Sequence, residues 1–268
     1  MISSIQAFYH SLKIQLRVIY ALFMREIITR YGRHNIGFLW LFVEPMIFIV
    51  LIALFWQAVR ASSFGQDIPI VPFAVIGYSV VLCWRNSVSR TTKAVSANTG
   101  LLYHRNVTVI DVFLARIFLE VFGATVSFLV LSVIFHVVGF MPMPDDFLYM
   151  VFGWGLMIWF AIGLAFVIGA LCEMSEVVNR LWNAFSIIMF PLSGVMFFVH
   201  WLPDIAKELV LYIPMVHLTE MIRHGYYGDV IPTYESVNYL VQCNLVLSFI
   251  GLTLVRQISN NNAGYDMI

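Results

Sequence analysis

The chain has 268 residues, of which 61% are hydrophobic and 11% are charged, and its formal net charge at pH 7 is zero. Soluble domains carry about 25% charged residues, so this composition excludes an ordinary soluble globular protein. The neutral balance gives no indication of a nucleic-acid partner, and we expect none. The apolar residues form continuous runs of roughly 20, long enough to cross a bilayer as helices, whereas a membrane β-barrel would show alternation. We therefore predict an all-α polytopic membrane protein with one transmembrane domain, 1–268.

The first predicted element is a helix over residues 12–33 that lies on the inner membrane surface. Its apolar stripe at helical spacing consists of Leu12, Leu16, Ile19, Phe23 and Ile27. Five charged residues between positions 13 and 30 make a membrane span unfavourable there. We interpret the segment as an interfacial helix. Glu26 and Arg30 are four residues apart and are expected to pair on its surface.

Six membrane spans are predicted, at residues 36–59, 71–92, 112–138, 147–172, 181–199 and 237–256. In the fourth span, Ala161, Ala165 and Gly169 are small residues at a spacing that lets another helix approach closely. Residues 200–235 are broken by prolines and glycines, so no single helix can cross the bilayer there. We expect two short external helices that re-enter the outer leaflet under a cover of protein.

The distribution of lysine and arginine predicts the orientation of these spans. Twelve of the 15 basic residues lie on the side of the two termini, and only Arg60, Lys207 and Arg223 lie on the other. Cytoplasmic loops carry the excess of basic residues, so both termini are predicted to be cytoplasmic.

Glu44 and Pro45 lie within the first span. A carboxylate there costs up to about 3 kcal/mol, and proline removes a backbone hydrogen bond and kinks the helix. Two interpretations stay open, a kinked helix that lines a polar path and a structural carboxylate paired with a neighbouring helix. Arg116 and Glu120, again four residues apart, are expected to form a structural pair at the start of the third span.

The sequence contains no Walker A, H-E-x-x-H or G-x-S-x-G motif, so we predict no catalytic residue. The histidines of the external region lack metal-ligand spacing, and we predict no metal site. Cys83, Cys172 and Cys243 lie in apolar runs and are interpreted as small hydrophobic residues.

Four segments resemble a known family. They are ALFMREIITRYGRHNIGFLWLFVEP (21–45), LLYHRNVTVIDVFLARIFLE (101–120), MFPLSGVMFFVHWLP (189–203) and YIPMVHLTEMIRHGYYGD (212–229). They resemble the transmembrane subunit of type-2 ABC exporters, and most of all the capsular polysaccharide exporters of Gram-negative bacteria. The resemblance implies a homodimer in the bacterial inner membrane with two ATP-binding subunits, which hold ATP and Mg, so that this chain has no cofactor of its own. It also implies a lipid-linked polysaccharide substrate, a periplasmic co-polymerase and outer-membrane export proteins.

The resemblance assigns residues to three roles. Contact with the ATP-binding subunit is implied for Arg25, Glu26, Arg30, Leu101, Tyr103, His104, Arg105 and Asp111. Glu44 and Pro45 match the family's first-span motif, and we predict that they line the translocation path together with Trp40 and Arg85. His217, Glu220 and Arg223 match an external motif that is expected to serve in gating or periplasmic docking.

Within this class, export of O-antigen or another polysaccharide is the alternative to capsule export. From a different class, a membrane-embedded glycan-modifying enzyme stays open, and it should place a cluster of titratable residues within one leaflet.

Overall fold

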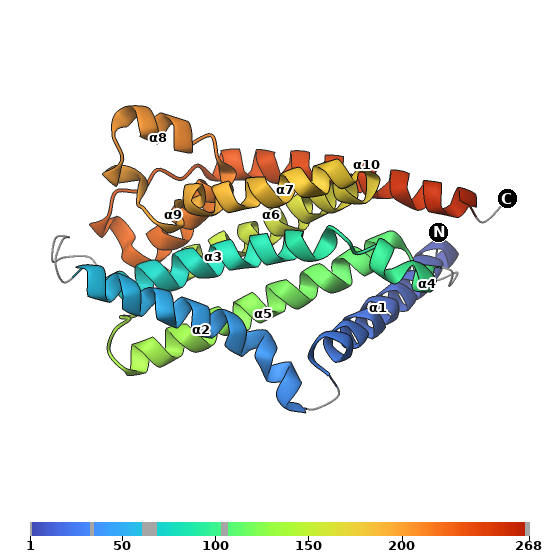
Figure 1. Ribbon diagram of the computed structural model, residues 1–268, viewed down its shortest axis with the longest axis horizontal. Helices are drawn as coiled ribbons and strands as arrows, with labels where there is room; N and C mark the ends of the chain where they lie inside the picture. The colour runs from blue at the N-terminus through green and yellow to red at the C-terminus, as the bar shows by residue number, and fades with distance from the viewer. Residues whose placement is uncertain (1, 33–34, 61–68, 103–106, 266–268) are drawn as a thin grey trace.

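The computed structural model describes residues 2–32, 35–60, 69–102 and 107–265. It is a bundle of helices that run along one long axis, and the described residues contain no strand (Figure 1). The long helices are α2 (Asn35–Arg60), α3 (Ile70–Thr91), α5 (Val109–Val137), α6 (Phe147–Met174) and α10 (Val237–Tyr265), with α7 (Glu176–Phe190) beside them.

Five helices in the described part are long and apolar enough to cross a membrane, namely Phe38–Ala58, Ile70–Thr91, Val109–Val137, Phe147–Met174 and Val237–Asn260. They correspond to five of the six predicted spans. The remaining predicted span, 181–199, is not one continuous helix, because α7 ends at Phe190 and a wider turn, η2 (Pro191–Val195), follows. Pro191 has no N–H to continue the helical pattern, and Gly194 adopts a left-handed φ of 81° that glycine tolerates without strain.

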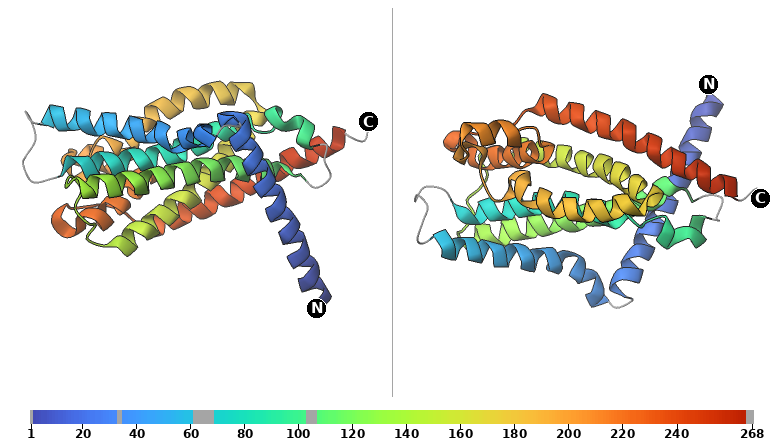
Figure 2. Two further views of the ribbon diagram at one scale, coloured as in Figure 1. Left: turned by 90° about the horizontal axis from the view of Figure 1, so that it is seen from below. Right: turned by 45° about the horizontal axis from the view of Figure 1, so that its top comes forward.

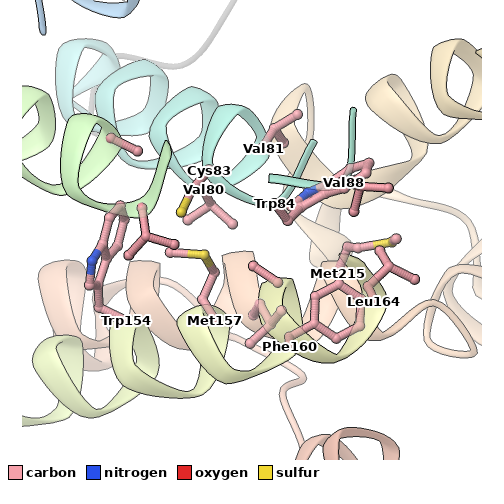
Figure 3. Close-up of a cluster of buried hydrophobic side chains, with 14 of the residues drawn as sticks. Val80, Val81, Cys83, Trp84, Val88, Trp154, Met157, Phe160, Leu164 and Met215 are labelled. Atoms are coloured by element: carbon pink, nitrogen blue, oxygen red, sulfur yellow. The ribbon is translucent and has the colours of Figure 1, made fainter. Parts of the chain in front are cut away.

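Helix α3 forms the centre of the bundle and packs against α2, α5, α6 and α9 (Pro214–Tyr227). Its Trp84 is fully buried. Figure 3 shows this indole facing Phe160 and Leu164 of α6 and Met215 of α9. The core therefore joins the spanning helices to the external helix α9.

The small residues of α6 bring helices close together, as predicted. Gly169 leaves no room for a Cβ, which would lie 2.9 Å from the Thr91 side chain of α3. The Thr91 hydroxyl donates a hydrogen bond of 3.2 Å to the carbonyl of Ala165. On the α10 side, a Cβ at Gly251 would lie 2.7 Å from Phe166.

Helix α1 (Ile2–Tyr31) begins ten residues before the predicted helix 12–33 and projects away from the bundle at a steep angle (Figure 2). Leu12 and Leu16 of the predicted stripe are exposed, whereas Ile27 is buried against Leu41 of α2 and Leu119 of α5. The apolar contact of α1 with the bundle is therefore concentrated near its C-terminal end.

Residues 200–235, predicted to be external, contain two short helices, as expected. They are α8 (Asp204–Val210) and α9, flanked by η3 (Val199–Trp201) and η4 (Gly228–Val230). Figure 1 places α8 and α9 at one end of the bundle. The short helices η1 (Ser96–Asn98) and α4 (Thr99–Leu102) lie at the other end, where α1 also lies. Helix α9 is buried along nearly its whole length. The rest of the protein thus covers the backbone of α9, whereas the insertion of α9 into the outer leaflet stays a prediction.

Candidate functional site

A polar cavity of about 290 Å³ lies between α2, α3 and α5, with one residue from α1. Its charged lining residues are Arg30, Glu44, Arg85, Arg90 and Glu120. Three arginines against two glutamates leave a formal surplus of one positive charge. The apolar walls are Leu41, Pro45, Phe48, Leu82 and Ala124. Charged residues are rare in membrane-spanning helices and usually face a bundle interior or water, so this cavity is the candidate functional site.

Pro45 shapes the α2 wall of the cavity. Helix α2 changes direction along its length (Figure 1), as expected where proline cannot donate to the carbonyl four residues earlier, that of Leu41. Gly123 of α5 lies against this carbonyl, and a Cβ there would be 3.3 Å from it. The Ser127 hydroxyl donates a hydrogen bond of 3.0 Å to the carbonyl of Phe42. Residues of α5 thus support the backbone of α2 beside Glu44.

Glu120 is held by arginines from two other helices. Its carboxylate pairs with Arg30 of α1, and its Oε1 lies 3.4 Å from Nε of Arg90 of α3. The Glu120 side chain is only 5% exposed. A buried carboxylate is strongly destabilising once its partners are removed, so this triad fixes α1, α3 and α5 relative to one another.

A second ion pair lies beside the triad and corrects the predicted pairing. The ion pairs of these residues join α1 to α5: Arg30 pairs with Glu120, and Arg116 Nε lies 3.1 Å from Oε1 of Glu26. Arg116 also donates a hydrogen bond of 2.9 Å to the carbonyl of Arg90. The expected pairs within helices, Glu26 with Arg30 and Arg116 with Glu120, are replaced because α1 packs against α5 and brings opposite charges together.

Other predicted coupling residues bind α1 to the connection between α3 and α5. Arg25 donates a hydrogen bond of 2.8 Å to Oδ1 of Asn98. Asp111 forms a capping box with Thr108 at the start of α5 and accepts a hydrogen bond from Gln15 of α1. These polar groups are therefore engaged within the chain.

The remaining predicted coupling residues lie on the same connection. Leu101 is half-buried in α4. Tyr103, His104 and Arg105 lie outside the described residues, so their role stays a prediction.

The predicted path residues separate into two groups. Glu44, Pro45 and Arg85 line the cavity together, whereas Trp40 is half-exposed on α2 and does not line it. The guanidinium of Arg85 lies 5.6 Å from the centre of the Phe190 ring, a cation–π contact. Arg90 and Glu120 were missed as cavity residues, although charges at span ends were the signal that could have identified them.

Arg223 occupies a fully buried position at the opposite end of the bundle. Its guanidinium donates to the carbonyls of Gly194, Phe197 and Val195 at 2.8, 2.7 and 3.1 Å, and more distantly to that of Phe73. It also lies 4.0 Å from the centre of the Phe73 ring. Burial lowers the pKa of Arg223 to about 10. This side chain fastens the bend after α7 to α9 and α3.

His217 and Glu220 support the same external region. The His217 ring bonds the carbonyl of Leu211 through Nε2 at 2.8 Å and accepts from the Ser236 amide through Nδ1 at 3.0 Å. A neutral imidazole can form both hydrogen bonds, with Nε2 as the donor and Nδ1 as the acceptor. Burial lowers the pKa of His217, which favours this neutral form. Burial raises the pKa of Glu220 to about 7, although Arg223 opposes this shift. Sequence reasoning missed a nearby contact, in which His224 Nδ1 lies 2.6 Å from Glu235.

The described residues contain no group of three or more histidine, cysteine, aspartate or glutamate side chains that could hold a metal ion. The three cysteines are free, with Cys83 and Cys172 buried and Cys243 half-buried.

Comparison with known proteins gives consistent matches over almost the whole chain. The model of the ABC-2 type transporter family matches residues 17–227. The chain is 49% identical to the capsule polysaccharide export inner-membrane protein CtrC of Neisseria meningitidis, over 94% of this chain and 95% of that protein. It is 44% identical to the protein of the same description, BexB, from Haemophilus influenzae, over 94% and 95%. It is 30% identical to the polysialic acid transport protein KpsM of Escherichia coli, over 91% and 94%.

Proposed function

The chain belongs to the ABC-2 type transporter family, and from this premise we propose that it is the membrane subunit of an ATP-driven capsular polysaccharide exporter. The observation that carries the proposal is its 49% identity, over nearly the full length of both chains, to an inner-membrane protein of capsule export. We place the chain in the bacterial inner membrane, where it moves a lipid-linked polysaccharide from the cytoplasm to the periplasm.

The chain crosses the membrane six times in this proposal, with α7 and its following turn as the fifth crossing. Five long apolar helices alone would leave the termini on opposite sides. Instead, the two ends of the chain lie at the same end of the bundle (Figure 1), which supports an even number of crossings. The excess of basic residues on that side supports a cytoplasmic location for both ends.

ATP and Mg are bound by two partner subunits in this proposal, because the sequence carries no Walker A motif. The chain forms a homodimer, and α1 with the connection between α3 and α5 forms the surface for the partners. This assignment is supported by the contacts that join α1 to that connection, such as Arg25 with Asn98. A periplasmic co-polymerase and outer-membrane proteins carry the polymer onward.

The polar cavity is the proposed start of the translocation path. An acidic polysaccharide is the substrate class that fits its surplus of positive charge, and one relative is named for transport of polysialic acid, a polymer of acidic sugars. The external motif of His217, Glu220 and Arg223 holds the outer end of the subunit, where it serves in gating.

The proposed function is tested by deleting the gene and restoring it on a plasmid. We expect the deletion strain to lose surface capsule, stained with a capsule-specific antibody, and to accumulate the polysaccharide inside the cell. O-antigen measured in the same cells should be unchanged, and its loss with normal capsule would favour the alternative substrate. Internal accumulation also separates export from glycan modification, because loss of a modifying enzyme would leave an altered polymer on the surface.

The contact with the ATP-binding subunits needs a separate test. Replacing Tyr103 and Arg105 together by alanine should leave the chain inserted in the membrane but reduce co-purification of the ATP-binding subunit and surface capsule. Normal capsule with a normally bound partner would remove this segment from the coupling role.

A further inference from the structure

The charges of the polar cavity are not equally satisfied. Glu120 is paired with both Arg30 and Arg90. Arg85 contacts the Phe190 ring, but the described part of the chain shows no carboxylate within ion-pair distance of it. Arg85 is thus a half-buried cation that faces a cavity without a carboxylate of its own.

On the basis of the proposed function, we propose that Arg85 binds an anionic group of the exported polymer, and that the Arg30–Glu120–Arg90 triad sets the affinity. The group is a carboxylate or a phosphate, since the planar guanidinium forms paired hydrogen bonds with either oxyanion. Glu44 lines the same cavity, and its negative charge repels an anion and so weakens its binding. Transport requires such a balance, because a bound group must also be released.

The triad makes the affinity depend on the position of α1. Among the cavity residues, Arg30 is the one supplied by α1, and the others come from α2, α3 and α5. If α1 moves away from α5, Arg30 leaves the cavity and the formal positive surplus falls to zero. Glu120 then has Arg90 as its remaining partner in the triad. The negative charge of Glu120 is less neutralised, so it repels an anion at Arg85 more strongly. Motion of α1, the helix proposed to meet the ATP-binding subunit, is thereby converted into release of the anion.

Two substitutions test this site in the intact complex reconstituted into nanodiscs of neutral lipid, and a third serves as the control. The probe is a fluorescent sialic acid oligomer, and a labelled dextran of equal length is the neutral comparison. Arg85→Gln should weaken binding of the acidic oligomer about tenfold or more, since one close charge commonly changes an ionic equilibrium by one to three orders of magnitude. Glu120→Gln should tighten it, because Arg30 and Arg90 then lack a carboxylate in the triad.

The matched control is Glu176→Gln, which removes an exposed carboxylate that pairs with Arg180 at 3.0 Å outside the cavity. It should leave binding unchanged. Should Glu120→Gln fail to assemble, Arg85→Gln still decides the question, since the ion pairs of Glu120 in the described structure are made by Arg30 and Arg90 and not by Arg85.

A second arm adds phosphatidic acid to the nanodiscs and measures its binding to the same variants. Arg85-dependent binding of the oligomer identifies a sugar carboxylate as the ligand, and Arg85-dependent binding of phosphatidic acid identifies a lipid phosphate. If Arg85→Gln alters neither, the inference is overturned. Normal capsule on cells carrying this variant would then leave the proposed export function intact, so the two failures can be told apart.

Discussion

Replacing Arg223 by glutamine should destabilise the external end of the subunit more than any exposed arginine replacement. The guanidinium satisfies buried carbonyls from the bend after α7, and glutamine can donate to at most two of them. Breaking a buried charged contact of this kind costs about 3–5 kcal/mol, and each orphaned buried carbonyl contributes about 1–3 kcal/mol of such a loss. A chain of this size loses about 2–4 °C of Tm per kcal/mol, so we expect Tm to fall by roughly 10 °C.

The assay uses the buried cysteines as reporters of unfolding. Cys83 and Cys172 are buried, so a thiol-reactive dye labels them when the detergent-purified protein unfolds on heating. Arg180→Gln is the control, because that side chain is 77% exposed and its ion pair with Glu176 is a surface contact worth about 0.5 kcal/mol. A Tm for Arg223→Gln within 2 °C of the Arg180→Gln control would refute the role of this guanidinium.

The remaining predictions concern topology, the cavity and pH. Cysteine introduced at Asp145 should react with a membrane-impermeant reagent added outside spheroplasts, whereas cysteine at Asn260 should not, and labelling of Asn260 would contradict cytoplasmic ends. Glu44→Gln should reduce export, measured by capsule staining, more than it reduces the amount of assembled complex, while full export by Glu44→Leu would exclude a role for this carboxylate in the path. Because burial raises the pKa of Glu220 to about 7, the folded state binds a proton that the unfolded state releases near pH 4.5, and stability should fall as pH rises through 7. Tm should therefore drop by a few degrees from pH 6.5 to 8, and Glu220→Gln should remove that drop.

Five of the six predicted spans and the anomalous carboxylate could be predicted from the sequence, because hydropathy depends on single residues and their neighbours along the chain. Glu44 stood out since a charge in an apolar run is visible without knowledge of packing. The break in the predicted span 181–199 was less visible. A single proline is tolerated in many membrane helices, and the turn at Gly194 is stabilised by Arg223, nearly 30 residues later.

The ion pairs could not be predicted in the same way, because the spacing of charges along one helix does not show which charges lie on the helices that pack against it. Glu26 and Arg30, or Arg116 and Glu120, are neighbours on one helix, and in water each pair would gain about 0.2–0.5 kcal/mol. Packing α1 against α5 offers each residue a partner on the other helix in a less hydrated setting, where a charge left unpaired is far more costly. The pairing across helices prevails for that reason.

This exchange of partners bears on how α1 is attached. Its exposed N-terminal half contributes little apolar contact, and Ile27 is its buried anchor near the C-terminal end. The polar contacts of Arg25, Glu26 and Arg30 lie within two turns of that anchor. A helix held mainly at one end by charges can pivot, because ion pairs lengthen gradually whereas interdigitated apolar packing must separate at once. A force applied to the projecting half by an ATP-binding subunit would therefore reach the contacts of Gln15 with Asp111 and Arg25 with Asn98 first, and then the ion pairs of Glu26 and Arg30. The pair of Arg30 with Glu120 is the one that lies at the polar cavity.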